Sequence, residues 1–152
     1  MVSAVAEGKT SISAFDNALH KAGVANFNLI KLSSVIPPAG KIIKAKPSFK
    51  NYFGQKLYCV YSVAYANEKG QGAYAGLGWV IDKKGQGLFV EHEGSSAVEV
   101  KHEIVSSLEE MMSRRAEFKN RKIKIQSEIT GKMCRGQITC ALVLAVYKAE
   151  CF

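Results

Sequence analysis

The alternation of apolar and polar positions along the chain predicts several strands and two helices. Runs of alternating or continuous apolar residues, bounded by Gly, Pro, Asn or Asp, are typical of strands. They cover residues 2–6, 26–36, 57–67, 73–82, 87–93, 122–127 and 137–149. Apolar positions three and four residues apart predict one helix from an N-cap at Thr10 to Ala22, and a longer helix from Ser95 or Ser96 to Phe118. Because short turns join most of the strands, the pattern favours an α+β fold.

An acidic residue interrupts the apolar stripe of the first predicted helix. Ile12, Phe15 and Leu19 have the spacing of one helix face, and Asp16 falls inside that stripe. A carboxylate on a core-facing stripe is costly unless it meets a cation or several hydrogen-bond donors. Asp16 is therefore either paired with a nearby Lys or Arg, or it accepts a cationic ligand in a pocket.

A second carboxylate stands out on the strand predicted at 87–93. Alternation places Phe89, Glu91 and Glu93 on one face of this strand. A carboxylate beside Phe89 on a partly apolar face would have its pKa raised by desolvation, which suits a proton donor. A solvent-facing Glu on an edge strand fits the same pattern equally well.

The third irregular feature is the pair Ser33-Ser34 near the end of the strand predicted at 26–36. Pro37 and Pro38 follow closely and can continue neither a strand ladder nor a helix. Serine pairs mostly mark turns. Neither G-x-S-x-G nor S-x-x-K surrounds them, so the pattern does not indicate a hydrolase nucleophile.

Composition and charge set limits on the class of protein. The 152 residues, 47% hydrophobic and 22% charged, are typical of one folded domain and exclude a disordered or collagen-like chain. Twenty-one Lys and Arg against 13 Asp and Glu give a net charge of +8, which raises the expectation of an anionic partner such as nucleic acid. The cations gather at 41–56 and 114–124, on a connector and at a helix–strand corner, where solvated surface explains them.

Cysteine spacing and hydropathy exclude further classes. The four Cys and three His occur at none of the intervals typical of zinc ligands, so no metal is expected. No apolar run approaches the roughly 20 residues that a bilayer requires. The start of the chain also lacks the basic and apolar segments of a signal peptide. We therefore expect a reduced, cytoplasmic protein with no membrane partner.

Two stretches of sequence resemble the pyruvoyl-dependent arginine decarboxylase family. They are TSISAFDNALHKAGVANFNLIKLSSVIPP at residues 10–38 and GLFVEHEG at residues 87–94. The resemblance implies a single domain over 1–152 with a four-layer αββα sandwich of mostly antiparallel sheets. It also implies a trimer or dimer of trimers with active sites between protomers. The implied activity is the conversion of L-arginine to agmatine and CO₂, for polyamine synthesis or acid resistance.

The same resemblance implies that the chain cleaves itself between the two serines. The Ser34 hydroxyl would attack the Ser33 carbonyl, giving a β chain of residues 1–33 and an α chain of residues 34–152. The α chain would begin with a pyruvoyl group derived from Ser34. This covalent cofactor would form a Schiff base with arginine and take the place of pyridoxal phosphate, without a metal.

The resemblance also assigns roles to individual residues. Glu91 would donate the proton after CO₂ leaves, and Asp16 would bind the guanidinium of arginine. The residues that would line the methylene chain of the substrate are Ile12, Leu19 and Phe89. Asn28 would assist processing, but on a straight strand it lies about 20 Å from Ser34. It could then reach the serine only around a bend or across a subunit contact.

Two alternatives remain open from the sequence. The chain could be a non-enzymatic relative whose Lys-rich surface binds an anion or nucleic acid, although nucleic acid is not the partner we expect. It could also apply the same chemistry to ornithine or lysine, because Asp16 suits any cation. A basic surface repels a cationic substrate at long range, so the acids Asp16, Glu91 and Glu93 must dominate inside the pocket.

Overall fold

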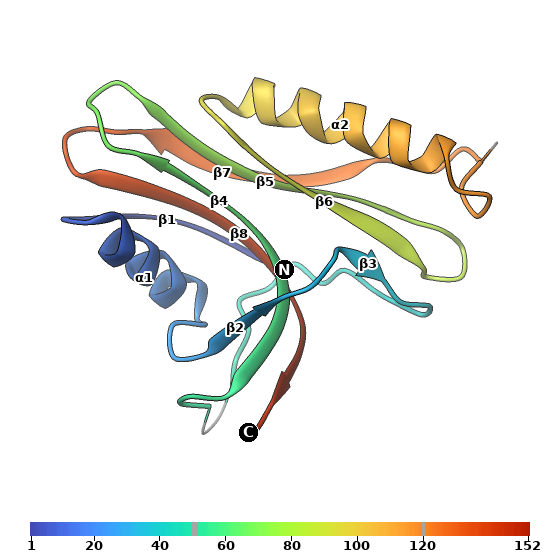
Figure 1. Cartoon of the computed structure of the whole chain (residues 1–152), viewed down its shortest axis with the longest axis horizontal. Coiled ribbons are helices and arrows are strands. Elements are labelled where there is room, and N and C mark those ends of the chain that lie inside the picture. The colour runs from blue at the N-terminus through green and yellow to red at the C-terminus, as the bar shows by residue number, and fades with distance from the viewer. Residues whose placement is uncertain (50–51, 120) are drawn as a thin grey trace.

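Two four-stranded sheets and two helices make up the computed structural model, which describes residues 1–49, 52–119 and 121–152 (Figure 1). The elements in chain order are β1 (Val2–Gly8), α1 (Ser11–Ala22), β2 (Asn28–Lys31), β3 (Val35–Ile36), β4 (Lys56–Ala66), β5 (Gly72–Ile81), β6 (Gly87–Gly94), α2 (Ala97–Ser113), β7 (Gln126–Met133) and β8 (Ile138–Glu150). The first sheet has the order β1-β8-β4-β2 and the second the order β3-β6-β5-β7. All neighbouring strands are antiparallel except β2 and β4, which confirms the predicted α+β class.

The first helix begins and ends where the sequence predicts. The Thr10 side chain caps the amide of Ser13, and the Ser13 side chain in turn accepts from the backbone of Thr10. Gly23 ends the helix in the left-handed conformation, at φ +82°, which glycine adopts without a Cβ clash. Its buried face is lined by small residues, and α1 therefore packs closely on β1 and β8. These small residues are Ala14, Ala18 and Ala22.

Three apolar clusters hold the elements together. Strand β8 shows how alternation distributes its side chains, because Leu142 and Leu144 join the cluster beneath α1 while Ala141 and Val143 join the cluster between the sheets. The third cluster joins the second sheet to α2 through the helix positions Val100, Ile104 and Leu108. In Figure 1, α1 lies beside the first sheet and α2 lies along the second.

The strand predicted at 26–36 is wrong as a single strand. Its first part, β2, belongs to the first sheet, and its last part, β3, belongs to the second. The amide of Leu32 still donates to the Cys59 carbonyl of the first sheet, at 2.9 Å, whereas the Ser34 carbonyl already accepts from the Phe89 amide of the second, at 2.8 Å. The chain therefore crosses between the sheets at Ser33, and the Ser33–Ser34 peptide bond lies in the crossover.

The segment after α2 also differs from the prediction. The helix ends at Ser113 rather than at Phe118, and β7 begins at Gln126 rather than at 122. Phe118 is buried and anchors a short series of turns against the α2 cluster, so it contributes to the core without being helical. Ile123 and Ile125 pack on the same cluster from outside any strand.

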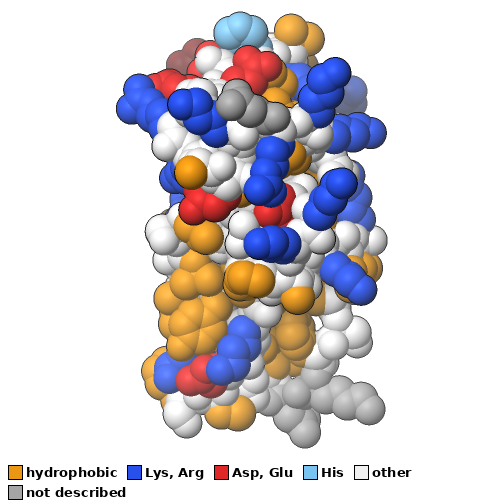
Figure 2. All heavy atoms as spheres, turned by 90° about the vertical axis from the view of Figure 1, so that its right-hand side faces the viewer, with side chains coloured by type: hydrophobic (Ala, Val, Ile, Leu, Met, Phe, Trp, Pro, Cys, Tyr) orange, Lys and Arg blue, Asp and Glu red, His pale blue; other side chains and the backbone are white. Residues whose placement is uncertain are grey.

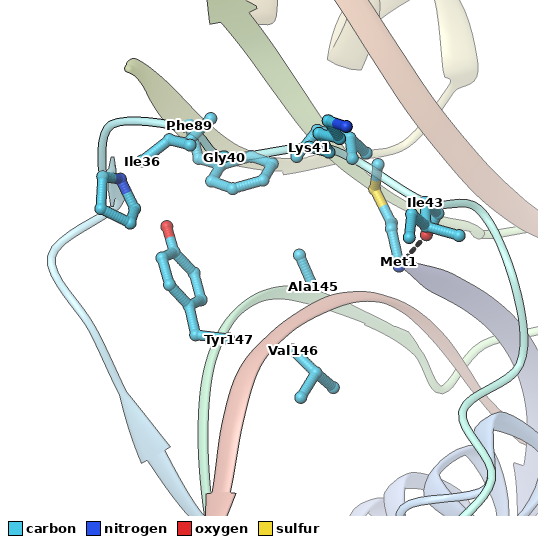
Figure 3. Close-up of a pocket in the computed structure, with 11 residues that line it drawn as sticks. Met1, Ile36, Gly40, Lys41, Ile43, Phe89, Ala145, Val146 and Tyr147 are labelled. Carbon is cyan, nitrogen blue, oxygen red and sulfur yellow. Dashed lines mark hydrogen bonds between the residues drawn. The ribbon is translucent and has the colours of Figure 1, made fainter. Parts of the chain in front are cut away.

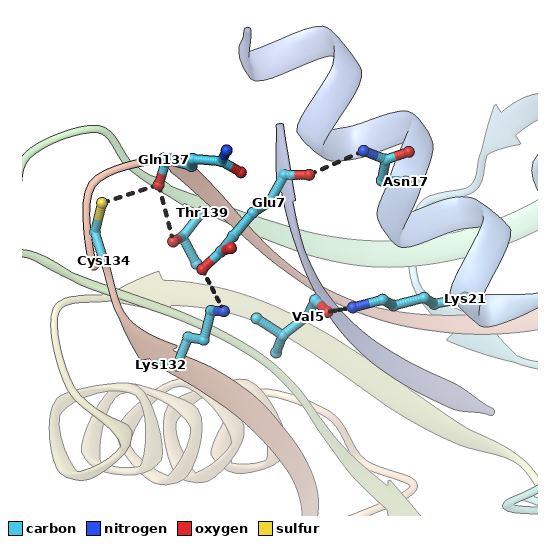
Figure 4. Close-up of polar contacts among 8 residues, drawn as sticks. All are labelled: Val5, Glu7, Asn17, Lys21, Lys132, Cys134, Gln137 and Thr139. Carbon is cyan, nitrogen blue, oxygen red and sulfur yellow. Dashed lines mark hydrogen bonds and ion pairs between the residues drawn. The ribbon is translucent and has the colours of Figure 1, made fainter. Parts of the chain in front are cut away.

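Polar contacts tie the first strand to its surroundings (Figure 4). From α1, Asn17 donates to the Glu7 carbonyl at 2.9 Å and Lys21 to the Val5 carbonyl at 2.8 Å. The Glu7 carboxylate pairs with Lys132 of β7 at 2.5 Å, so this contact connects the two sheets.

Among the described residues, neither helix is long and apolar enough to span a bilayer.

Candidate active site

Ser34 occupies an unusual backbone conformation in the crossover. Its φ is +66°, in the left-handed region that is costly for residues with a Cβ. Its half-buried side chain donates from Oγ to Oε1 of Glu91 at 2.5 Å. Because the Phe89 amide also holds its carbonyl, both the side chain and the backbone of Ser34 are bound to β6. Ser33, immediately before it, is exposed.

Glu91 reaches Ser34 because of the strand register. Val35 pairs with Leu88, which brings the bend at Ser34 alongside Phe89 of β6. Glu91 lies two residues further along β6, on the same face as Phe89, and is half-buried. Because β6 also lies between β3 and β5, the alternative of a solvent-facing Glu on an edge strand is wrong. His92 lies on the opposite face, where its Nε2 is 2.8 Å from Ser107 Oγ of α2.

Tyr147 is a third member of this site that the sequence did not single out. The hydroxyl group donates to the Val35 carbonyl at 3.0 Å. The ring packs edge-on against Phe89, with centroids 6.2 Å apart. Burial, followed by the nearby charge of Glu91, raises the pKa of Tyr147 to about 12, so this phenol stays protonated at neutral pH. The tyrosine lay within a uniformly apolar strand pattern, which gave no signal of its role.

A cavity of about 320 Å³ lies beside Phe89 and Tyr147 (Figure 3). The connector after β3 supplies much of its wall, and the end of β8 supplies most of the rest. The lining residues are Met1, Ile36, Pro37, Gly40, Lys41, Ile42, Ile43, Phe89, Ala145, Val146 and Tyr147. The cavity beside Phe89 and Tyr147 is thus mainly apolar.

Asp16 lies outside this cluster. Its side chain is 56% exposed and is 3.5 Å from the similarly exposed His20, one helical turn later. The prediction that Asp16 shares a core-facing stripe is wrong, because the alanine face of α1 is the buried one. Ile12 is 82% exposed for the same reason. Asp16 and Ile12 thus share an open face of the helix.

Two further predicted residues are also engaged elsewhere. Leu19 is only 6% exposed and belongs to the apolar cluster beneath α1, so it does not line the cavity beside Phe89. Asn28, at the start of β2, donates from Nδ2 to the Gly54 carbonyl at 2.6 Å. Of the predicted lining residues, Phe89 alone packs against the described serine–carboxylate cluster, through its contacts with Ser34 and Tyr147.

Two of the four cysteine thiols are unsuited to nucleophilic chemistry. Burial raises the pKa of Cys59 to about 11 and that of Cys140 to about 12, so both thiols are protonated and unreactive at neutral pH. Within 1–49, 52–119 and 121–152, no three His, Cys, Asp or Glu side chains converge as a metal site would require. The Ser34 hydroxyl, in contrast to these two thiols, is hydrogen-bonded to a carboxylate at a strained bend.

The basic residues form a separate surface (Figure 2). Lys and Arg gather over the upper part of the face shown, above a more apolar lower part. A hollow of about 530 Å³ lies between the turn after β5 and the segment before β7. Its lining residues are Ile81, Asp82, Lys83, Arg121, Lys122, Ile123 and Lys124. On the connector, Lys44 pairs with Glu128 at 2.7 Å, and Lys50 is outside the described residues. Lys56, the first residue of β4, lies over the Phe152 ring.

Comparisons with known proteins show the family to which the chain belongs. A family model described as pyruvoyl-dependent arginine decarboxylase matches residues 1–151. The enzyme of that name from Pyrococcus furiosus is 38% identical over 150 residues, covering 97% of this chain and 94% of the relative. The Pyrococcus abyssi enzyme is 37% identical over the same coverage, and the Thermococcus kodakarensis enzyme 37% over 131 residues, or 85% and 82% of the two chains. The chain belongs to the pyruvoyl-dependent arginine decarboxylase family.

Proposed function

We propose that this chain cleaves itself between Ser33 and Ser34 and then decarboxylates L-arginine to agmatine and CO₂. The observation that carries the proposal is the 2.5 Å contact between Ser34 Oγ and Glu91 at a bend with positive φ. A strained bend beside a carboxylate favours attack by the hydroxyl on the preceding carbonyl, because the reaction releases the strain. Membership of the family supports the same activity.

The cleavage is balanced without any reagent other than water. Ser34 Oγ attacks the carbonyl carbon of Ser33, the C–N bond breaks, an ester C–O bond forms, and the hydroxyl proton ends on the freed amine. Loss of the Cα hydrogen of residue 34 then expels the Ser33 carboxylate and leaves a dehydroalanine. Its imine tautomer takes up one water and releases ammonia, which leaves a ketone at position 34.

The surroundings of Ser34 fit the resulting pyruvoyl group. That group has no more heavy atoms than the serine from which it derives, so the space at residue 34 is sufficient. The Phe89 amide already holds the carbonyl that the group retains. A pyruvoyl group supplies a carbonyl that accepts the electrons released when CO₂ leaves. No pyridoxal phosphate or metal is then required.

In decarboxylation, Glu91 is the proposed proton donor. Its Oε1 accepts from Ser34 Oγ, two bonds from the Cα of residue 34, which becomes the ketone carbon to which the substrate amine is joined. Phe89 and Tyr147 shield this place on the cavity side and limit the access of water. An apolar wall there also strengthens the electrostatic effect of the Glu91 carboxyl group on the reacting atoms.

Asp16 remains the proposed partner of the arginine guanidinium, supplied by a second copy of the chain. On its own chain, Asp16 lies on the open face of α1 beside exposed Ile12, and α1 packs on the first sheet whereas Glu91 belongs to the second. An exposed isoleucine next to an exposed carboxylate is suited to a contact that buries both. We therefore propose a homo-oligomer, as a trimer or dimer of trimers, of four-layer αββα protomers.

Two further residues have supporting roles in the proposal. Leu19 would pack beneath the face of α1 that carries Asp16. Asn28 would aid processing, because its hydrogen bond to the Gly54 carbonyl anchors the start of β2.

Mass spectrometry of the two serine variants tests the proposal. The wild-type chain should separate under denaturing conditions into fragments 1–33 and 34–152, the latter with a blocked first residue. Ser34→Ala should remain intact because it lacks the nucleophile. Ser33→Ala is the matched control, and it should still cleave because only its carbonyl takes part. A wild-type chain that stays intact, or a Ser34→Ala chain that cleaves, would contradict the proposal.

The identity of the amino acid is tested separately with arginine, ornithine and lysine. The cleaved protein should release CO₂ from arginine at least about 100-fold more efficiently than from lysine, since a planar guanidinium binds a carboxylate through two parallel hydrogen bonds. Equal release from all three amino acids would mean that the site recognises only a positive charge.

A further inference from the structure

A β-bulge places Tyr147 at the crossover between the sheets. Tyr58 of β4 pairs with Lys148 of β8, but the next residue, Cys59, pairs with Val146. Tyr147 is thus the extra residue of β8, without a partner in the register. Bulges of this kind redirect a side chain and are common next to active sites.

The redirected ring reaches the residue that follows Ser34. Its hydroxyl donates to the Val35 carbonyl at 3.0 Å, and its ring edge rests against Phe89. Figure 3 shows the ring below Phe89, with the hydroxyl directed toward the segment that contains Ile36. The phenol is therefore a fixed donor on the C-terminal side of the bend.

Three hydrogen bonds together determine the geometry of the bend. Ser34 Oγ is bound to Glu91, the Ser34 carbonyl to the Phe89 amide, and the Val35 carbonyl to Tyr147. The first two come from β6, whereas the third comes from β8 of the other sheet. Since Ser34 has an unfavourable positive φ, the residues on either side of it must be held in place. Tyr147 is the side chain that ties the bend to the first sheet.

We propose that Tyr147 is a positioning residue for self-cleavage, holding the Val35 carbonyl so that the Ser34 hydroxyl stays directed at the Ser33 carbonyl. This inference rests on the proposed function. The same hydrogen bond remains available after cleavage, because Val35 stays bonded to residue 34. Tyr147 then keeps the first residue of the α chain in place for decarboxylation.

The test compares cleavage rates of Tyr147→Phe, the wild type and the control Tyr65→Phe. Tyr65 lies on β4 and is exposed, outside the cavity lining. Each chain is made by cell-free synthesis, and the ratio of intact chain to the two fragments is followed by mass spectrometry. Tyr147→Phe should cleave about 10-fold more slowly, which corresponds to about 1.4 kcal/mol. The Tyr65→Phe rate should stay within about 2-fold of the wild type, as for a surface change.

Two further measurements separate positioning from a purely structural or chemical role. Replacing Tyr147 with 4-aminophenylalanine restores an N–H donor on the same ring and should return the rate to within about 3-fold of the wild type. The pH profile of cleavage in Tyr147→Phe should keep its shape while its amplitude falls, because the phenol acts without changing its protonation state. Thermal unfolding of each variant, measured alongside, shows whether it is folded.

The outcomes are distinguishable from those of the proposed function. If the wild type cleaves and Tyr147→Phe cleaves at the same rate, the positioning role is wrong while the proposed function stands. The same conclusion follows if 4-aminophenylalanine fails to restore the rate, or if the pH profile of Tyr147→Phe changes shape. A wild-type chain that never cleaves overturns both.

Discussion

The bend at Ser34 and the open face of α1 differ in how much of their surroundings one chain supplies. At the bend, the Ser34 hydroxyl, the Ser34 carbonyl and the Val35 carbonyl each have a partner in the same chain. On α1, the Asp16 carboxylate has an exposed histidine at 3.5 Å. The difference supports the proposed division, in which one copy cleaves itself and a second copy completes the arginine site.

Physical reasons support this division. Cleavage is intramolecular, so its groups must be held together before any partner arrives. Exposed ion pairs contribute little in water, and the contact of Asp16 with His20 therefore leaves the carboxylate available. The same carboxylate would bind a guanidinium far more strongly once a neighbouring chain excluded water from it.

The largest effect is expected from Glu91→Gln, which should separate cleavage from turnover. The amide oxygen of Gln still accepts the hydrogen bond from Ser34, so cleavage should slow by less than about 10-fold. Arginine turnover should fall by at least about 100-fold, because the amide cannot deliver a proton. Cleavage is read by mass spectrometry and turnover by released CO₂. Wild-type decarboxylation in this variant would refute the role of Glu91.

The next effect is expected from Asp16→Asn, which should leave cleavage unchanged and raise KM for arginine by about 10- to 100-fold through loss of a charge-assisted contact. His20→Gln, on the same exposed face, is the matched control and should keep KM within about 2-fold. The decisive extension mixes Ser34→Ala chains, which are inactive alone, with Asp16→Ala chains, which alone turn over little arginine at concentrations far below their raised KM. Random assortment between neighbouring subunits should restore about one quarter of the sites. No recovery in mixed oligomers would place the whole site within one chain.

The smallest effect is expected from Glu7→Gln, which removes the contact between β1 and β7 without touching either region. The hydrogen bond from Lys132, followed by its charge, lowers the pKa of Glu7 below its ordinary value of 4.5. Stability from this pair is therefore present above pH 4.5 and lost as the pH falls through the lowered pKa of the folded state. Unfolding temperatures of Glu7→Gln and the wild type should differ at pH 7 and converge in acid. A difference that persisted in acid would contradict this assignment, and cleavage should be unaffected throughout.

Some parts of the fold and site were predictable because their signals are local. Thr10 and Gly23 mark the two ends of α1 through contacts within a few residues. The alternation from Phe89 to Glu91 placed both side chains on one face of β6. The break between β2 and β3 was not predictable in this way. An apolar run has the same pattern whether it stays in one sheet or crosses to another, and here long-range pairing with Cys59 and Phe89 decided it.

The sequence by itself determined the fold class, the extents of most elements and, through its resemblance to a family, the residues Ser33, Ser34 and Glu91 as candidates for chemistry. Tertiary structure decided that Ser34 meets Glu91, that Tyr147 joins them through a bulge, and that Asp16 stands on an open face. The reason is that helix caps and strand alternation depend on neighbouring residues. Strand register and the orientation of a helix depend instead on how distant apolar surfaces pack.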